Sequence, residues 1–176
     1  MKENIYRIII IGLLALFVGF SYWVKKNIRA NQRLVYNVSD QIKPFTLPTI
    51  DRRPVELQDI VSDNKLTWVN FWATWCGPCR QEMPMMSELY EQYHEKGLGM
   101  VGISIGERPA TVTKYLTKSP VPYPILVDSM RTQSQPSNIT TVPTSFLVDD
   151  SGMILHVSEG IPEGWDQIIK RTLDDE

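Results

Sequence analysis

The motif Trp-Cys-Gly-Pro-Cys at residues 75–79 constrains the fold of this chain more than any other feature. It follows an apolar, β-prone run at residues 66–72 and a short turn at 73–75, and a long stretch of helical spacing comes after it. This order places Cys76 at the N-terminus of a helix. There the unpaired backbone N–H groups and the helix dipole stabilise a thiolate, which is the form of cysteine that attacks a disulfide.

Cys76 and Cys79 are the only cysteines among the 176 residues, so any thiol chemistry takes place here. We expect Cys76 to be the exposed attacking thiol, and Cys79 to lie beneath it and resolve the mixed disulfide. A structural bridge is poorly motivated, because closing so short a loop contributes only about 2 kcal/mol. A zinc site would need two further ligands, and the two histidines, His94 and His156, lie in separate segments. We therefore predict redox chemistry and no metal.

Length and composition indicate one ordinary domain with an N-terminal extension, because domains cluster near ~100–150 residues. The formal net charge of -2 gives no electrostatic reason to expect a nucleic-acid partner. Two cysteines are too few to staple a small scaffold, so we expect an ordinary hydrophobic core.

Residues 8–24 form an uncharged and mostly apolar run, which predicts a transmembrane anchor. At about 25 Å the run is at the short end for a membrane span, and a cleaved signal peptide is the alternative. Tyr22 and Trp23 suit the membrane interface. We divide the chain into a flank at 1–7, the anchor at 8–24, a tether at 25–39 and a folded domain at 40–176.

Two considerations about the orientation of this anchor disagree. Lys25, Lys26, Arg29 and Arg33 follow the run, so the positive-inside rule alone would put the domain in the cytoplasm. A tethered thiol enzyme is more useful outside, where soluble cytosolic reductants do not reach its substrates. We expect a single-pass protein of the bacterial cell membrane with its catalytic domain on the extracytoplasmic side.

The rest of the chain alternates strand and helix patterns, which predicts an α/β layer architecture. Apolar and polar residues alternate on both sides of a turn at 49–53, which predicts a β-hairpin leading into the strand at 66–72. Residues 130–135 could start a helix that Pro136 stops. We further predict strands at 99–105, 125–127, 142–148 and 153–157, and helices from the motif to residue 93 with a kink at Pro84, at 111–118 and at 163–173.

Residues 71–79 together with Val142-Pro143-Thr144 resemble the thioredoxin fold. The N-terminal hairpin, Pro84, the Gly106-Glu107 pair and the anchor make residues 40–173 most similar to the ResA/TlpA-type membrane-anchored thiol–disulfide oxidoreductases of bacteria. The resemblance implies a thioredoxin-like α/β fold, with a central mixed sheet flanked by helices, an N-terminal β-hairpin and one N-terminal transmembrane helix.

The same resemblance implies roles for residues around the motif. In the family the proline matching Pro143 is cis and faces the cysteines, so Val142 would offer its backbone to an extended substrate segment. Glu107 matches a cavity-lining acid, with an ordinary loop residue as the alternative. The candidate substrate-binding residues are Trp75, Gly77, Pro78, Glu107, Val142 and Pro143.

Two positions depart from soluble thioredoxin. Asn70 stands where thioredoxins usually have a buried aspartate, so that proton relay is missing. Glu82 occupies a position where the ResA-type branch carries an acid near the active site. Our hypothesis is that Glu82 is catalytic and manages the proton of the cysteine pair, although a carboxylate there also opposes thiolate formation. The alternative is a solvated carboxylate in the first turn of the helix.

The function implied by the resemblance is reduction of disulfides in exported proteins. The leading example in the family is oxidised apocytochrome c before haem attachment. The expected partners are that protein substrate and a membrane thiol carrier as electron donor, and no cofactor is needed because electrons travel as thiols. Alternatives are an oxidase or isomerase, although Gly77-Pro78 favours reduction, or a non-enzymatic assembly factor. A peroxidase would usually need a Thr-x-x-Cys site, and position 73 is Ala.

Overall fold

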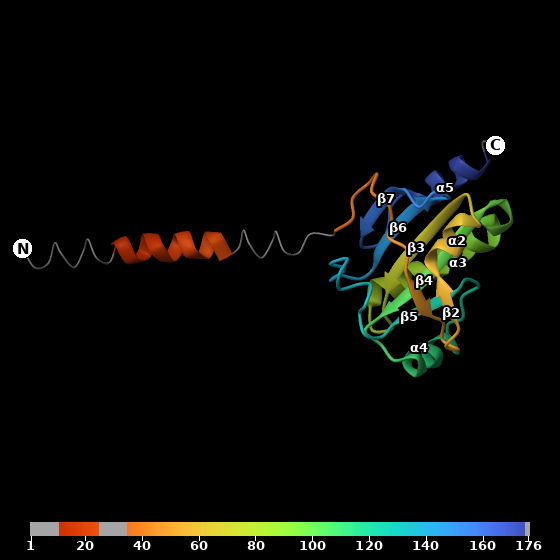
Figure 1. Ribbon diagram of the computed structural model, residues 1–176, viewed down its shortest axis with the longest axis horizontal. Helices are drawn as coiled ribbons and strands as arrows, with labels where there is room; N and C mark the ends of the chain where they lie inside the picture. The colour runs from red at the N-terminus through yellow and green to blue at the C-terminus, as the bar shows by residue number, and fades with distance from the viewer. Residues whose placement is uncertain (1–10, 25–34, 175–176) are drawn as a thin grey trace, which may run out of the picture. The chain divides into compact units, whose positions relative to one another are not determined.

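The computed structural model describes residues 11–24 and 35–174 and divides the chain into two units, residues 1–33 and Leu34–Glu176 (Figure 1). In the first unit, residues 11–24 are helical, and most of their large apolar side chains are exposed. None of the helices in the described ranges has the length and apolar character to cross a membrane. The predicted anchor begins at residue 8, and its first three residues lie outside the described ranges.

The second unit is built on a mixed sheet of five strands in the order β5-β4-β3-β6-β7. The three parallel strands are β3 (Leu66–Trp72), β4 (Leu98–Ile105) and β5 (Ile125–Asp128). The antiparallel strands are β6 (Thr144–Asp149) and β7 (Ile154–Glu159). All seven residues of the central strand β3 are buried, which agrees with the apolar run that predicted it.

Two hydrophobic cores lie on opposite faces of this sheet. On one face the core includes residues of α3 (Gly77–Tyr93), α4 (Pro109–Leu116) and α5 (Trp165–Asp174). On the other face it includes residues of α2 (Leu57–Ser62) and of the N-terminal hairpin formed by β1 (Thr46–Pro48) and β2 (Pro54–Glu56). The predicted layered α/β fold with an N-terminal hairpin is confirmed.

Two local predictions were wrong. The chain does not run from the hairpin straight into β3, because α2 intervenes and buries Leu57 and Val61 in the second core. Residues 130–135 do not start a helix but form turns. There the Asp128 carboxylate accepts hydrogen bonds from the backbone N–H groups of Thr132, Gln133 and Ser134, which anchors the segment as a loop around one buried side chain.

The topology brings three separate parts of the chain to one edge of the sheet. The parallel strands β3 and β4 end there, and the segment that enters the antiparallel strand β6 starts there (Figure 1). The turn at 73–75 leads from β3 into α3, and the loop at 106–108 leads from β4 into α4. The residues around the cysteine pair therefore come from three stretches of the chain, at positions 70–82, 104–107 and 141–145.

Candidate active site

Cys76 lies at the N-terminus of α3, as the sequence pattern predicted. Its backbone N–H donates to the Ala73 carbonyl at 3.1 Å, which closes the turn after β3. Cys76 is the N-cap residue, and its Sγ accepts a hydrogen bond from the backbone N–H of Cys79 at 3.2 Å. The same sulfur thus takes up one of the unpaired donors at the start of the helix.

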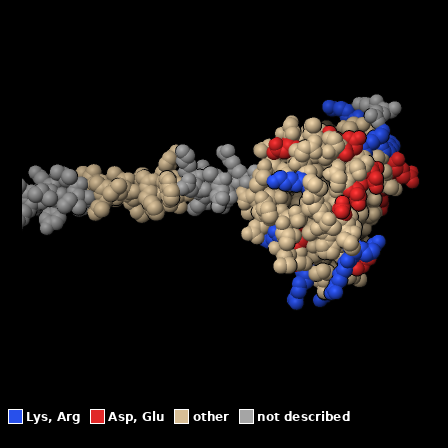
Figure 2. Space-filling view, in the orientation of Figure 1, with Lys and Arg blue, Asp and Glu red and all other residues tan. Residues whose placement is uncertain are grey.

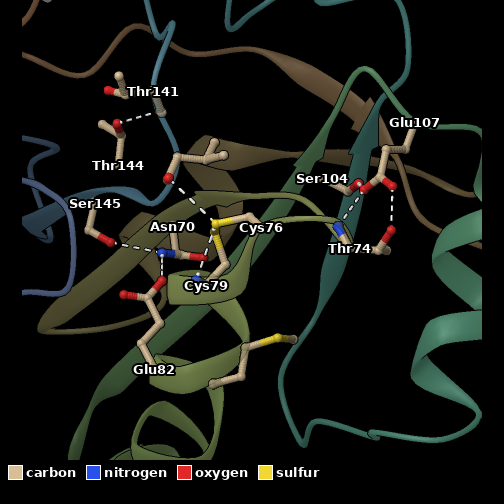
Figure 3. The surroundings of a disulfide bond; sticks show 12 residues. Asn70, Thr74, Cys76, Cys79, Glu82, Ser104, Glu107, Thr141, Thr144 and Ser145 are labelled. Carbon is tan, nitrogen blue, oxygen red and sulfur yellow. Dashed lines mark hydrogen bonds between the residues drawn. A yellow bond between two sulfur atoms is a disulfide. The ribbon is translucent and has the colours of Figure 1, made fainter.

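Cys76 and Cys79 are joined by a disulfide (Figure 3). In this oxidised form Cys76 is only 4% exposed and Cys79 is 0% exposed, so the expectation of an openly exposed Cys76 was wrong. One reason is that the Val142 carbonyl oxygen lies 3.5 Å from Cys76 Sγ and covers it. Cys76 is nevertheless the less buried residue of the pair.

The segment that faces the disulfide contains a cis peptide bond between Val142 and Pro143. It is held from both sides, since the Thr144 hydroxyl donates to the Thr141 carbonyl at 2.9 Å and the Gly160 N–H donates to the Pro143 carbonyl at 2.8 Å. The cis bond and its position opposite the cysteines agree with the expectation from the resemblance. A role of Val142 in binding substrate stays a prediction.

The rim around the disulfide is partly apolar. Trp75 is 63% exposed, Pro78 is exposed and Gly77 is half-buried. A Cβ atom added at Gly77 would meet no heavy atom within 4 Å, so the space next to the disulfide is open at this point. These three predicted substrate-binding residues therefore border accessible space.

Glu82 is buried beneath the motif and is 1% exposed, so the alternative of a solvated carboxylate was wrong. Asn70 Nδ2 of β3 donates to Glu82 Oε1 at 2.7 Å, whereas Oε2 is buried and has no hydrogen-bond partner among the described residues (Figure 3). Burial raises the pKa of Glu82 to about 7, and the Asn70 hydrogen bond opposes this shift. A carboxyl group with that pKa can both accept and release a proton near neutral pH.

The sequence contained a signal for the burial of Glu82. Cys79, Glu82, Met83 and Met86 have the spacing of one helix face, and all four are buried in α3. Because residues three apart are neighbours on a helix, Glu82 lies on the same side of α3 as Cys79. The structure thus brings the predicted acid and the predicted resolving cysteine to one face.

Glu107 is also buried, at 8% exposure, but its carboxylate serves a different purpose. It accepts hydrogen bonds from the Thr74 backbone N–H at 2.8 Å, the Thr74 hydroxyl at 2.5 Å and the Ser104 hydroxyl at 3.0 Å (Figure 3). The Glu107 backbone carbonyl accepts from the Ser129 hydroxyl at 2.7 Å. Glu107 therefore ties the turn before the motif to β4 and to the loop after β5.

Sequence reasoning missed the polar residues that support these two acids. Thr74 and Ser104 hold Glu107, and Ser145 lies across the sheet from Asn70. These partners are separated by up to 75 positions along the chain, so local spacing carries no sign of the pairing. The one available signal was a polar residue inside an otherwise apolar strand, as at Ser104 and Asn70.

A strand and a turn that deliver a cysteine pair to a helix N-terminus, opposite a cis-proline, define the class of thioredoxin-fold thiol–disulfide oxidoreductases, and this protein is a member of that class. The chain belongs to the AhpC/TSA family, whose model matches residues 38–157, and within it to the ResA-type oxidoreductases.

Relatives and solved structures agree with this assignment. The chain is 29% identical over 166 residues to the thiol-disulfide oxidoreductase ResA of Bacillus thuringiensis subsp. konkukian, covering 91% of each chain. It is 28% identical over 148 residues to ResA of Bacillus subtilis, covering 84% of this chain and 81% of that one. The crystal structure of a putative thiol:disulfide interchange protein DsbE from Chlorobium tepidum matches with a TM-score of 0.69 at 26% identity, covering 79% of this chain and 96% of that one.

The raised pKa of Glu82 predicts how stability depends on pH. Between about 4.5 and about 7 the folded protein binds a proton that the unfolded chain has released, so the free energy of unfolding falls as the pH rises through this range. Glu82→Gln removes the ionisation. The free energy of unfolding of the variant minus that of the wild type should therefore be larger at about pH 8 than at about pH 4, by about 2–3 kcal/mol.

Denaturant unfolding of the oxidised protein at both pH values measures this difference. Glu88→Gln is the matched control, because Glu88 is exposed on the same helix. Parallel pH dependence of the wild type and Glu82→Gln would contradict the burial of an ionisable Glu82.

The hydrogen bonds of Glu107 predict a different response to substitution. Glu107→Ala leaves the N–H and the hydroxyl of the half-buried Thr74 without their acceptor, and should lower the free energy of unfolding by about 1–3 kcal/mol. Glu107→Gln should cost less, since its amide oxygen can accept from the Thr74 N–H while its amide nitrogen donates to the Thr74 hydroxyl. Unfolding curves that rank the two variants in the opposite order would exclude this role for Glu107.

Proposed function

We propose that this protein reduces disulfides of exported proteins while tethered to the outer face of the cytoplasmic membrane. The observation that carries the proposal is the pairing of a disulfide at a helix N-terminus with a buried acid on the same helix, whose pKa is raised by burial to about 7. The Gly-Pro dipeptide between the cysteines supports the direction, because reducing thioredoxins carry the same dipeptide.

In the first step the reduced enzyme attacks its client. The Cys76 thiolate forms a bond to one sulfur of the client disulfide, and the other client sulfur leaves as a thiolate that takes a proton from solvent. Cys76 is suited to this step because its sulfur accepts a backbone N–H at the helix N-terminus and it is the less buried cysteine of the pair. The exposed Trp75 ring and the Val142 backbone are the proposed contacts for an extended client segment.

In the second step Cys79 resolves the mixed disulfide. The Glu82 carboxylate accepts the Cys79 thiol proton, and the resulting thiolate attacks the Cys76 sulfur. The second client thiolate leaves, which completes the transfer of two electrons to the client, and the enzyme is left as the disulfide described above. Its return to the dithiol form requires a second thiol donor, for which we propose a membrane thiol carrier.

The proposed client class is an exported protein with a closely spaced cysteine pair, of which oxidised apocytochrome c is the leading candidate. The exposed Trp75 and the open space at Gly77 leave room for a client segment next to the cysteines. The sharing of the domain with ResA proteins supports this choice.

The proposed anchor is the predicted span at 8–24. Its described part, residues 11–24, is helical and carries no charged side chain (Figure 2). Apolar residues such as Leu16 and Phe17 expose 71% and 69% of their surface, which is unfavourable in water and is relieved by lipid.

The reduction potential decides between a reductase and an oxidase. We expect the fragment Leu34–Glu176, equilibrated in graded thiol/disulfide buffers, to have a potential near or below about -270 mV. The fragment should include Tyr36, because this buried residue packs against Phe146 with ring centroids 5.6 Å apart. A potential near about -120 mV would mean that the protein oxidises its clients.

The client itself can be trapped. Cys79→Ser in the full chain should accumulate a mixed disulfide between Cys76 and the client, because resolution is blocked. The double variant Cys76→Ser/Cys79→Ser is the control and should trap nothing. Trapped proteins without a closely spaced cysteine pair would contradict the proposed client class.

The location is tested separately in intact cells that express the full chain. After reduction, a membrane-impermeant thiol reagent should modify Cys76, and Cys76→Ala is the control for this labelling. Labelling that appears only after the cells are permeabilised would place the domain in the cytoplasm, as the flanking positive charges alone suggest.

A further inference from the structure

A connected set of four polar side chains lies beneath the disulfide. It consists of Trp68 and Asn70 on β3, Ser145 on β6 and Glu82 on α3, and each is at most 2% exposed. Figure 3 shows Asn70 beside the cysteine pair, joined by dashed lines to Ser145 and to Glu82. Buried polar groups of this kind are costly unless they are paired, so their connections constrain one another.

The register of the sheet fixes these connections. Asn70 and Ser145 are directly opposite each other in the antiparallel pair of β3 and β6. Trp68 lies two residues before Asn70, on the same face of β3. Trp68 Nε1 donates to Ser145 Oγ at 2.9 Å, and Asn70 Nδ2 donates to Ser145 Oγ at 2.9 Å and to Glu82 Oε1 at 2.7 Å.

The chemistry of these groups fixes which of them donates and which accepts in each hydrogen bond. An indole N–H can only donate, so Ser145 Oγ must accept from Trp68. Both hydrogens of the Asn70 amide nitrogen are then used, one on Ser145 and one on Glu82. If the amide turned over, the Ser145 hydroxyl could donate to the amide oxygen, but that oxygen would also face the ionised carboxylate and the amide would no longer donate to Glu82. By accepting the second amide hydrogen, Ser145 leaves no buried N–H of Asn70 unpaired in the orientation that favours the ionised form of Glu82.

We propose that Ser145, fixed by Trp68, is a positioning residue that holds the Asn70 amide N–H on Glu82 and thereby controls proton transfer at this carboxylate. The inference rests on the proposed function, in which Glu82 accepts the Cys79 proton. It adds that proton transfer depends on a hydroxyl of another strand that touches neither sulfur nor substrate in the proposed mechanism.

Other groups near Glu82 do not replace this hydrogen bond. Burial raises the pKa of Glu82, and the Asn70 hydrogen bond is the interaction that lowers it. Cys76, the N-cap of α3, and Cys79 are joined in the disulfide and do not titrate in the oxidised protein, which leaves Tyr123, just before β5. Burial, followed by the charge of Glu82, raises the pKa of Tyr123, so Tyr123 is neutral where Glu82 titrates. On β3 and β6, the neighbours Asn70, Trp68 and Ser145 are neutral.

The test is the titration of Glu82 in full-length oxidised protein, followed by ¹³C NMR of labelled glutamate carboxyls and assigned with Glu82→Gln. Ser145→Ala leaves one Asn70 N–H unpaired in the orientation that the ionised Glu82 requires. In the turned orientation the amide oxygen still accepts from the protonated Glu82, so the variant favours the neutral acid. We expect the pKa of Glu82 to rise from about 7 to about 8. Ser145→Thr keeps the hydroxyl and should restore the value of the wild type.

Two further variants separate positioning from a general loss of packing. Ser145→Ala leaves the buried Trp68 N–H unpaired, whereas Trp68→Phe/Ser145→Ala removes donor and acceptor together and should raise the pKa of Glu82 equally. Thr67→Val is the control. It removes a buried hydroxyl of β3, and this hydroxyl has no hydrogen-bond partner among the described residues. It should leave the titration unchanged.

A second readout links the titration to the reaction. The pH dependence of mixed-disulfide resolution should move upward in Ser145→Ala by the same amount as the Glu82 titration. An unmoved Glu82 titration in Ser145→Ala and in the double variant would overturn the inference. If Glu82→Gln itself left the thiol titration and turnover unchanged, the proposed function of Glu82 would fail instead, whatever the Ser145 variants did.

Discussion

The burial of one carboxyl group under a disulfide is the constraint on which the rest of the site depends. Glu82 is removed from water, and burial alone would keep it protonated. The single hydrogen bond from Asn70 opposes that effect, and together they bring the pKa to about 7. An acid at this balance point changes its protonation state with small changes around it. The formation or loss of a charge on a neighbouring sulfur is a change of that kind.

The two buried glutamates of the site show how the same side chain serves opposite purposes. Glu107 accepts three hydrogen bonds and fixes the turn before the cysteines, so its carboxylate is fully used. Glu82 accepts one and leaves its second oxygen without a partner among the described residues. Unused hydrogen-bonding capacity inside a protein is expensive, and it is retained at Glu82 next to the reacting pair. The hydrogen bonds of Glu107 hold the turn before the cysteines in place, whereas we propose that Glu82 transfers a proton.

The sheet makes this division possible. Its parallel strands end at one edge, where Thr74 follows β3 and Glu107 follows β4, and the cis-proline segment enters β6 at the same edge. The antiparallel register of β3 and β6 then places Ser145 opposite Asn70, one layer below the sulfurs. A shift of β6 by one residue would turn Ser145 to the other face of the sheet and would leave Asn70 without this partner. The titration of the acid is therefore tied to the pairing of two strands.

Local periodicity and turn residues were enough to predict the strand at 66–72, the helix that begins at the cysteine motif, the N-terminal hairpin and the closing β6-β7 pair. The sequence also named the cysteine pair and Glu82. It did not predict α2 or the loop around Asp128, where contacts outweigh local propensity. Packing alone placed the Val142 carbonyl against Cys76 and set Trp68 and Ser145 behind Asn70. The helix spacing carried a signal that Glu82 is buried, but its hydrogen bond from Asn70 depends on how α3 packs against β3. These contacts join residues far apart in the chain, so local spacing does not identify the partners.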